Sequence, residues 1–467
     1  MCGITGIYGL TGQQARDEAR ETIAGMNAAL AHRGPHASGI WDTDVELVLG
    51  HQRLSIIDTQ EASNQPFLDA KSGDALVFNG EVYNYRELRV ELEAHHDFQT
   101  DSDTEVVLVA LHQWGRSALH RFNGMFAFAW WNSEQRELLL VRDRLGIKPL
   151  YYSESNGALL FASEIRSLLA SNRVKREHDP VGLADYLRYQ TVHAPRTILK
   201  DVKLLEPGHW IRLQGEEMQM EKWWDAAHEA SLLPPVSSRK ERTDRIRTQL
   251  KEAVRLRMRA DVPLGAFLSG GIDSSAIVGL MQEVSEHQIS TFSVTFNEGE
   301  FDESPYSRLI AERFNTNHHE IRLTAENFLE QVPAALAAMD HPSGDGPNTF
   351  VVSEATKKAG ITVALSGLGG DELFAGYPVF IRSHDLVQKR WLASWPKGLR
   401  KLVGSVYAAI KSTGTARKMA DILAGDYFDL EHTYPLSRQM LLERDLRKVA
   451  PGLARHPNAV FGWMQQA

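Results

Sequence analysis

The chain has 467 residues, of which 43% are hydrophobic and 24% are charged, and these ordinary globular values exclude a wholly disordered, collagen-like or coiled-coil protein. The 51 basic and 60 acidic side chains give a net charge of −9, which argues against a general nucleic-acid binder. The longest apolar run, residues 125–131, is far shorter than the roughly 18 residues that a bilayer span requires, so we expect no membrane helix.

The only cysteine of the chain is Cys2, so no intrachain disulfide can form, and a cytoplasmic location is the simplest expectation. Two interpretations of Cys2 remain open. It is either a small apolar residue in a first strand or, once Met1 is removed, a nucleophile whose thiol and free α-amine lie on one residue. The reference pKa of such an amine, roughly 7.7–8.0, suits a general base at neutral pH.

Short apolar or β-branched runs predict a sheet-rich domain over residues 1–205. The expected strands are 3–9, 45–49, 75–78, 125–131, 138–141 and 159–162. Helices are expected over 85–95 and 104–114, the second because its apolar residues recur at helical spacing. A breaker at 206–208 and a Pro/Ser-rich stretch that ends near residue 240 predict a linker over residues 206–240.

The second half of the chain, residues 241–467, alternates strands with helices. The expected strands are 264–268, 290–296, 319–321 and 361–365, and the expected helices are 243–260, 274–281, 305–314, 325–339 and 350–359. This alternation is typical of βαβ units and predicts a doubly wound, parallel α/β sheet. Ligands of such sheets bind beyond the carboxyl ends of the strands, so motifs should follow the strands.

A glycine-rich loop follows the first of these strands. It reads Ser269-Gly270-Gly271-Ile272-Asp273-Ser274-Ser275 and opens a predicted helix. Glycines let the backbone approach a phosphate, and Asp273 can hold Mg²⁺ against it. The loop has no lysine, so it is not a Walker loop. A plain glycine turn with a helix cap is the alternative interpretation.

A second glycine-rich loop, Ser366–Glu372, follows the strand that ends near residue 365. By itself it could be only a loop and a helix cap. Two such loops at the ends of two strands of one sheet together indicate a nucleotide site. Val294, in the strand between them, would then lie against the base.

Polar clusters in the first domain fit a zwitterionic amino acid. They are Arg53, the run Asn79-Gly80-Glu81 at a strand end, and Asp103, which lies at the start of a helix and could simply cap it. Each has a structural explanation by itself. Taken together, an arginine suits the α-carboxylate of an amino acid, and the two acids suit its α-ammonium group.

The chain resembles the glutamine-dependent asparagine synthetase family. The motifs that carry the resemblance run from residue 1 to about 378 and include MCGITG, HRGP from His32, HQRLSI from His51, FNGEVYN from Phe78, RDRLGIKPLYY from Arg142, FASE from Phe161, LSGGIDSS from Leu268 and LSGLGGDELFAGY from Leu365. The resemblance implies an N-terminal-nucleophile αββα sandwich, a class-II glutamine amidotransferase, followed by a PP-loop ATP pyrophosphatase domain.

The resemblance also implies roles for individual residues. Cys2 would attack the side-chain amide of glutamine, Asn79 and Gly80 would form the oxyanion hole, and Arg53, Glu81 and Asp103 would hold the backbone groups of glutamine. ATP would contact Leu268, Ser269, Gly270, Gly271, Asp273, Ser274, Val294, Ser366 and Gly367. Asp273 and Asp371 would bind Mg²⁺. The implied substrates are glutamine, ATP and a carboxylate acceptor, and a homodimer is possible.

Two departures from the family pattern affect the expected function. Leu368 stands where the second loop of the family commonly has a glutamate, which puts the identity of the amide acceptor in doubt. The C-terminal motif and lysine of the family are not found between Tyr377 and Ala467, so we expect a truncated or naturally short relative. Glutamine-dependent amide synthesis with release of AMP and pyrophosphate is the expected activity. A glutaminase with a non-functional synthetase scaffold is the alternative.

Overall fold

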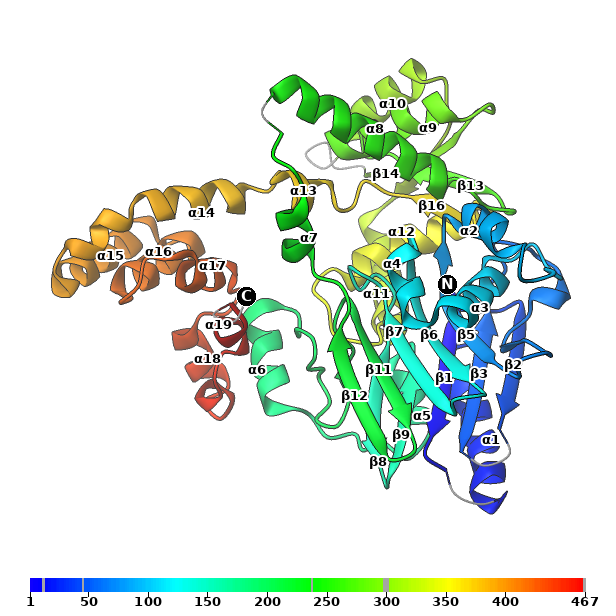
Figure 1. Cartoon of the computed structure of the whole chain (residues 1–467). Coiled ribbons are helices and arrows are strands. Elements are labelled where there is room, and N and C mark those ends of the chain that lie inside the picture. Colours follow the sequence, from blue (N-terminus) through cyan, green and yellow to red (C-terminus); the bar gives the residue numbers. More distant parts are fainter. Residues whose placement is uncertain (11–12, 44–45, 237, 297–301, 465–467) are drawn as a thin grey trace. The chain divides into compact units, whose positions relative to one another are not determined.

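The computed structural model describes residues 1–467 apart from 11–12, 44–45, 237, 297–301 and 465–467 (Figure 1). The chain forms two compact units. The first unit contains residues 1–177, 201–340 and 348–366, and the second contains residues 178–200, 341–347 and 367–467. In the described part of the chain, no helix combines the length and the apolar character that a membrane crossing requires.

Two six-stranded sheets stack in the first unit. The first sheet has the order β10-β8-β9-β1-β3-β2 and is built from β1 (Gly3–Tyr8), β2 (Ala37–Asp42), β3 (Leu47–Arg53), β8 (Tyr151–Ser155), β9 (Ala158–Ala162) and β10 (Lys203–Leu204). The second has the order β12-β11-β7-β6-β5-β4 and is built from β4 (Phe67–Leu68), β5 (Ala75–Val82), β6 (Gly124–Asn132), β7 (Glu137–Arg142), β11 (His209–Gln214) and β12 (Glu217–Lys222).

Helices cover the outer face of each sheet. Helices α1 (Gln13–Ala28) and α5 (Ile165–Ala170) pack on the first sheet. Helices α2 (Tyr85–Leu92), α3 (Asp103–Trp114) and α4 (Ala118–Arg121) form an apolar core with the second sheet. A second core, which includes Ile4, Leu49, Val77 and Ala127, fills the space between the sheets. These four layers confirm the predicted αββα sandwich.

Several strands of the sandwich have other bounds than the sequence pattern predicted. The predicted strand 45–49 is β3, which begins at Leu47, and residue 45 lies outside the described residues. Strand β5 continues to Val82, so Asn79-Gly80-Glu81 lies inside the strand rather than at its end. Strands β11 and β12 form a hairpin that pairs with β7, so the second sheet extends beyond residue 205 into the predicted linker.

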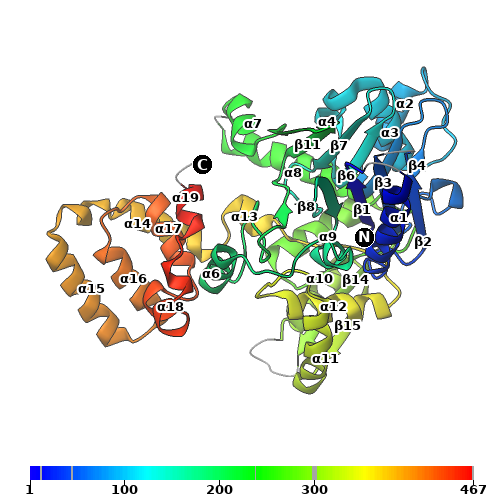
Figure 2. The same cartoon turned by 90° about the horizontal axis from the view of Figure 1, so that it is seen from below.

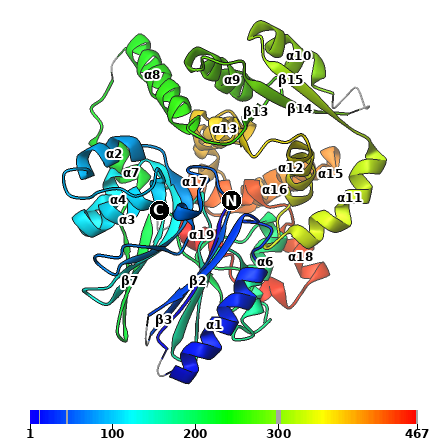
Figure 3. The same ribbon diagram turned by 90° about the vertical axis from the view of Figure 1, so that its right-hand side faces the viewer.

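A four-stranded parallel sheet lies in the second half of the first unit, as predicted. Its order is β15-β14-β13-β16, with β13 (Leu264–Phe267), β14 (Ser290–Phe296), β15 (Asn317–Leu323) and β16 (Val363–Leu365). Figures 1 and 3 show α8 (Arg239–Arg257) and α9 (Ile272–Val284) on one side, and α11 (Ala325–Ala338) and α12 (Gly346–Lys358) on the other. Right-handed crossovers require this placement, because the chain reverses direction across the sheet after β15.

The second unit is helical where the structure describes it (Figure 2). It contains α6 (Pro180–Tyr189), α13 (Gly370–Phe374), α14 (Pro378–Gln388), α15 (Lys397–Lys411), α16 (Gly414–Ala424), α17 (Leu430–Arg438), α18 (Glu443–Val449) and α19 (Ala459–Met464). Arg188, which is 1% exposed, joins its distant segments: its Nε donates to Glu443 Oε1 over 2.7 Å, and its Nη2 donates to the carbonyl oxygen of His456 over 2.9 Å.

Candidate active site

A cavity of about 50 Å³ in the sandwich brings together all six residues that the sequence predicts around glutamine. They come from distant parts of the chain: Cys2 precedes β1, Arg53 ends β3, and the triplet Asn79-Gly80-Glu81 belongs to β5. Asp103 begins α3, and Ser102 caps this helix by accepting a hydrogen bond from the backbone N–H of Thr104. The two stacked sheets therefore supply the nucleophile and the polar side chains to one place.

The backbone holds Cys2 at the cavity. Its thiol donates to the carbonyl oxygen of Leu54 over 3.6 Å and accepts from the Leu54 N–H over 3.4 Å. The Nε of Arg33 donates to the Cys2 carbonyl oxygen over 2.9 Å. Burial raises the pKa of the thiol, whereas the Leu54 hydrogen bond and nearby positive groups oppose this shift. The pKa of the Met1 α-amine, which precedes Cys2 in this chain, is lowered to about 5, first by burial.

Asn79 and Gly80, the residues predicted to form an oxyanion hole, both line the cavity. The Asn79 side chain is fully buried and lines the cavity, and neither its Oδ1 nor its Nδ2 has a hydrogen-bond partner in the described structure. A Cβ added to Gly80 would lie 2.4 Å from the carbonyl oxygen of Met125, so only glycine fits there. An amide donor that lacks a protein partner is available to a substrate oxygen.

Arg53 is held by neutral acceptors. Its Nη1 donates to the carbonyl oxygen of Gln60 over 2.8 Å and to Asn64 Oδ1 over 2.9 Å, and its Nη2 donates to the carbonyl oxygen of Asp58. No carboxylate of the described residues forms an ion pair with Arg53 within the 4.0 Å limit that defines one. The guanidinium is therefore positioned while its charge remains available to a carboxylate ligand.

Two buried acids share the cavity. Burial raises the pKa of Asp103 to about 7, and the charge of Glu81 adds to this shift, although the N–H of Val82 donates to Asp103 Oδ2 over 3.0 Å. Burial also raises the pKa of Glu81, and the positive charge of Lys148 opposes it. An ammonium ligand between these carboxyl groups would favour their ionised forms.

The predicted phosphate loop lies between β13 and α9. Gly270 has a φ of +81°, and an added Cβ would lie 2.5 Å from Tyr306 Cβ, so glycine is required by both conformation and space. The Ser269 and Ser274 hydroxyl groups are 3.0 Å apart and brace the turn. No side chain caps the start of α9, so its first N–H groups can serve an anion.

The neighbouring strands place more of the predicted nucleotide residues at the same edge. Because β13 pairs in parallel with β16, Leu268 and Ser366 both follow the carboxyl ends of adjacent strands. Val294 lies two residues beyond Phe292, the register partner of Phe267, and is therefore level with Ser269. Gly367 and Asp371 belong to the second unit, where α13 contains Asp371.

Comparison with known proteins identifies both halves. Residues 1–224 match the model of the glutamine amidotransferase domain, and residues 245–457 match the asparagine synthase model. A putative glutamine-hydrolysing asparagine synthetase from Methanocaldococcus jannaschii is 34% identical over 87% of this chain and 80% of its own length. This chain belongs to the glutamine-hydrolysing asparagine synthetase family. It is an enzyme of that type, with an amidotransferase part and a synthase part.

Other relatives show how much of the family architecture the chain contains. Asparagine synthetase 1 of Bacillus subtilis is 36% identical over 88% of this chain, but the match covers 64% of that protein. A putative asparagine synthetase of Mycobacterium tuberculosis is 35% identical over 97% of this chain and 71% of its own length. Relatives with other names also match: the amidase chry2 of Gibberella zeae is 32% identical over 85% of this chain and 62% of its own length.

Several family motif residues have structural roles that sequence reasoning did not assign. Glu164, from the FASE motif, accepts from Arg33 Nη1 over 2.7 Å and lies 3.0 Å from His32 Nε2. Asp143, from the RDRLG motif, accepts four backbone N–H groups, of residues 126, 145, 147 and 148. The loop that Asp143 shapes places Lys148 in the cavity wall beside Cys2.

Asp273 suits Mg²⁺ by its donor type and position. It lies in the first turn of α9, directly after the glycine-rich loop, and has no ion pair in the described structure. Mg²⁺ commonly binds one or two carboxylates together with substrate phosphates, which this arrangement permits.

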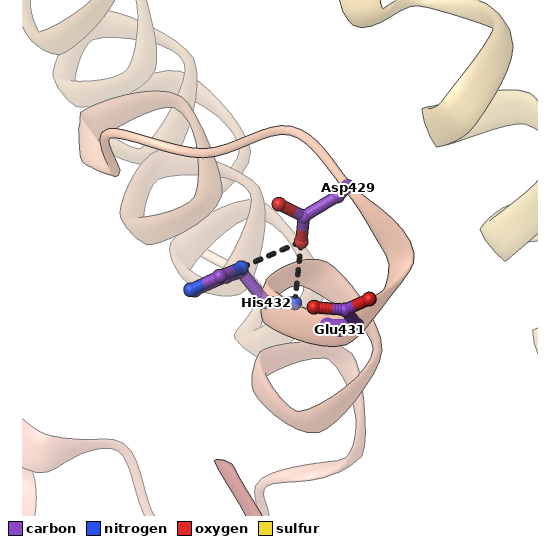
Figure 4. A group of neighbouring side chains, drawn as sticks. All are labelled: Asp429, Glu431 and His432. Atoms are coloured by element: carbon purple, nitrogen blue, oxygen red, sulfur yellow. Dashed lines mark hydrogen bonds and ion pairs between the residues drawn. The ribbon is translucent and has the colours of Figure 1, made fainter. Parts of the chain in front are cut away.

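A different acidic group, Asp429, Glu431 and His432, has its ligand atoms within 4.8 Å of one another (Figure 4). Asp429 Oδ1 accepts from the His432 N–H over 2.9 Å and lies 2.6 Å from its Nδ1. Capping of α17 accounts for this cluster, which carries no metal assignment.

Proposed function

We propose that this chain couples glutamine hydrolysis at Cys2 to ATP-dependent amidation of a carboxylate acceptor. One observation carries the proposal: Cys2 shares a single cavity with Asn79 and Gly80 and with Arg53, Glu81 and Asp103. This set has a nucleophile, an oxyanion donor pair and groups of both charges for the α-carboxylate and α-ammonium of glutamine. The glycine loop at Ser269 supports the second half of the proposal.

In the glutaminase reaction, the Cys2 sulfur forms a bond to the amide carbon of the glutamine side chain. The thiol proton passes to the α-amine of Cys2, exposed by removal of Met1, and Asn79 Nδ2 with the Gly80 N–H stabilises the oxyanion. The amine returns the proton to the leaving nitrogen, and ammonia departs. Water then attacks the thioester carbon and releases glutamate and the thiol.

In the synthase reaction, a carboxylate is a poor acyl donor because oxide is a poor leaving group. Adenylation by ATP makes AMP the leaving group and releases pyrophosphate. Ser269, Gly270, Gly271 and Ser274 would hold the phosphates, and Leu268, Val294, Ser366 and Gly367 would surround AMP. Mg²⁺ bound by Asp273 and Asp371 would neutralise charge on the departing pyrophosphate.

The family suggests the carboxylate acceptor, and Leu368 is the residue of this chain that departs from the family pattern at that point. Aspartate is the acceptor that the names of the relatives suggest, and Leu368, which is 87% exposed, stands in the second loop where a carboxylate is expected. A leucine cannot hold ammonium or accept a proton. We therefore propose aspartate or another carboxylate as the acceptor. A cytoplasmic location, a homodimer and the division of the chain at residues 205 and 240 stay predictions.

The decisive experiment incubates the full chain with glutamine, ATP, Mg²⁺ and a panel of carboxylates that includes aspartate, and identifies products by mass spectrometry. We expect glutamate, AMP, pyrophosphate and one amide. The Cys2→Ala variant should lose glutamate release and retain synthesis from ammonium chloride. Glutamate release without AMP formation under any acceptor would instead support a glutaminase with a non-functional synthase scaffold.

A further inference from the structure

Lys148 is a buried lysine at the wall of the Cys2 cavity. Its side chain is 5% exposed, and its Nζ forms no hydrogen bond or ion pair with the residues that the structure describes. Lysines are rarely buried to this extent unless they are paired, because the loss of hydration disfavours the charged form. Burial at this position therefore disfavours the charged form of Lys148, and the charges of Glu81, Cys2 and Asp143 oppose that effect only in part, because the net pKa shift is downward.

The backbone around Lys148 is fixed in place. Its N–H donates to Asp143 Oδ2 over 3.0 Å, and its carbonyl oxygen accepts from Arg142 Nε over 2.9 Å. Arg142 also donates to the carbonyl oxygen of Gly146 over 2.6 Å, and Gly146 has a φ of +64°. The loop between β7 and β8 is thus braced at several points, and this bracing directs one lysine side chain to the wall that Cys2 shares.

The charged surroundings of Lys148 come from several elements. The groups that act on it are Cys2, Arg33, Glu81 and Asp143, and Lys148 acts in turn on the N-terminal amine. Arg53 also faces the Cys2 thiol. Burial lowers the pKa of Lys148, and the positive charge of Lys148 acts to lower the pKa values of the Cys2 thiol, the Met1 α-amine and Glu81. The effects of Lys148 on the thiol and the amine favour the thiolate and the free amine that the proposed reaction uses, whereas burial opposes the charged form of Lys148 and the charges of Glu81, Cys2 and Asp143 favour it.

We propose that Lys148 is a positioning residue of the glutaminase site, whose ammonium group acts as the electrostatic partner of the Cys2 thiolate. Lys148 itself gains and loses no proton: the thiol proton passes to the α-amine, and the fixed positive charge stabilises the sulfur anion that remains. The same charge disfavours protonation of the amine before attack. This inference rests on the proposed glutamine hydrolysis for its biological use, but its electrostatic content does not depend on that activity.

The test uses the rate at which iodoacetamide alkylates the full-length protein as a function of pH. Cys2 is the only cysteine, so the alkylation rate reports on one thiol. Lys148→Met keeps an unbranched chain and removes the charge, and Lys148→Arg keeps the charge. Lys175→Met, at an exposed lysine outside the cavity, is the matched control. Glutamate release is measured over the same pH range, and thermal melts verify that each variant is folded.

We expect Lys148→Met to move the alkylation midpoint up by about one pH unit, which corresponds to roughly tenfold slower alkylation at a fixed pH below the midpoint. The acid limb of glutamate release should move in the same direction. The alkylation midpoint of Lys148→Arg should stay close to that of the parent protein, and the midpoint of Lys175→Met should equal it. If Lys148→Met does not fold, Lys148→Gln replaces it.

A folded Lys148→Met protein with the parent midpoint would overturn the proposal, even if its activity were lost, because a purely structural lysine would behave in that way. A shifted midpoint in a chain that does not hydrolyse glutamine would support the electrostatic pairing and would refute the proposed function. The two failures are therefore distinguishable.

Discussion

Asn79→Ala should lower the rate of glutamine hydrolysis without lowering the free energy of unfolding. The Asn79 side chain is fully buried, and neither polar atom of its amide has a partner in the described structure. A buried polar group without a hydrogen bond costs about 1–3 kcal/mol. Removal of this amide therefore relieves a cost, and the space that it leaves joins a cavity of about 50 Å³ that Asn79 already lines. We expect the free energy of unfolding to stay the same or to increase by about 1 kcal/mol.

The same substitution should strongly impair glutamine hydrolysis. Loss of one oxyanion-hole donor typically lowers kcat by about 10²–10³-fold, equivalent to about 2.7–4 kcal/mol of transition-state stabilisation. The KM for glutamine should change little, because the donor acts on charge that develops only in the transition state. The predicted signature is therefore a large loss of kcat in a protein that is at least as stable as its parent.

The assay combines glutamate release with denaturant unfolding, and Asn27→Ala provides a matched control. Asn27 is also buried, but its Oδ1 accepts from Thr5 Oγ1 over 2.8 Å and its Nδ2 donates to the carbonyl oxygen of Gly39 over 3.1 Å. Asn27→Ala should lower stability and leave kcat nearly unchanged. If Asn79→Ala kept kcat within threefold of the parent, or lost more than about 2 kcal/mol of stability, the oxyanion assignment would be wrong.

Three further predictions concern carboxylates. Asp273→Asn should lower pyrophosphate release by orders of magnitude and spare glutamate release; equal pyrophosphate release would remove Asp273 from the metal site. Burial raises the pKa of Asp103 from 3.8 to about 7. The contribution of this group to the free energy of unfolding therefore falls as the pH rises from about 4 to 7, because the folded state retains a proton that the unfolded state has already lost. Asp103→Asn should accordingly raise Tm at pH 8 but not at pH 4. The KM for glutamine should rise about tenfold from pH 8 to pH 6 as the carboxylate is lost, and a flat KM would contradict this role. Asp261 Oδ2 accepts from the Asp58 N–H over 2.8 Å, so Asp261→Ala should raise the KM for glutamine up to about tenfold, and an unchanged KM would show that this contact does not position the site.

Hydrophobic patterning was sufficient to predict much of the fold. The parallel sheet follows from strands alternating with helices, and β14 has the bounds that its β-branched run indicates. The hairpin β11–β12 was missed because both of its strands lie within residues 206–240, which were predicted to form a linker. A signal for it exists in the chain: Trp210, Ile211 and Leu213 are buried in β11, and a glycine turn at Gly215 follows. The ends of the helices in the second unit were not predicted from the sequence. Part of what holds this unit together is long-range, as in the contact of Arg188 with Glu443, which lies 255 positions away, and local patterns do not show such contacts.

The candidate site was predicted in part. Cys2 and the five polar-cluster residues around it were named from the sequence, and the stacking of two sheets that brings them together is a tertiary property that motifs cannot show. The sequence indicates no separate role for Lys148, which appears only as part of the RDRLGIKPLYY motif. Lysine is normally exposed, and the burial of this one depends on Asp143, whose carboxylate accepts four backbone N–H groups and folds the loop inward. No local pattern carries that information.

Several groups around Cys2 are individually unfavourable for folding, and one substrate would relieve all of them. The Asn79 amide has no partner, burial raises the pKa of the Asp103 carboxyl to about 7, and burial lowers the pKa of Lys148. A core selected only for stability would replace such groups with apolar side chains. An amino acid with an ammonium group, together with the anions that form during hydrolysis of its side-chain amide, supplies the missing charge to each group. Under the proposed function, the cost is concentrated at this cavity because the binding and turnover of glutamine there would offset it.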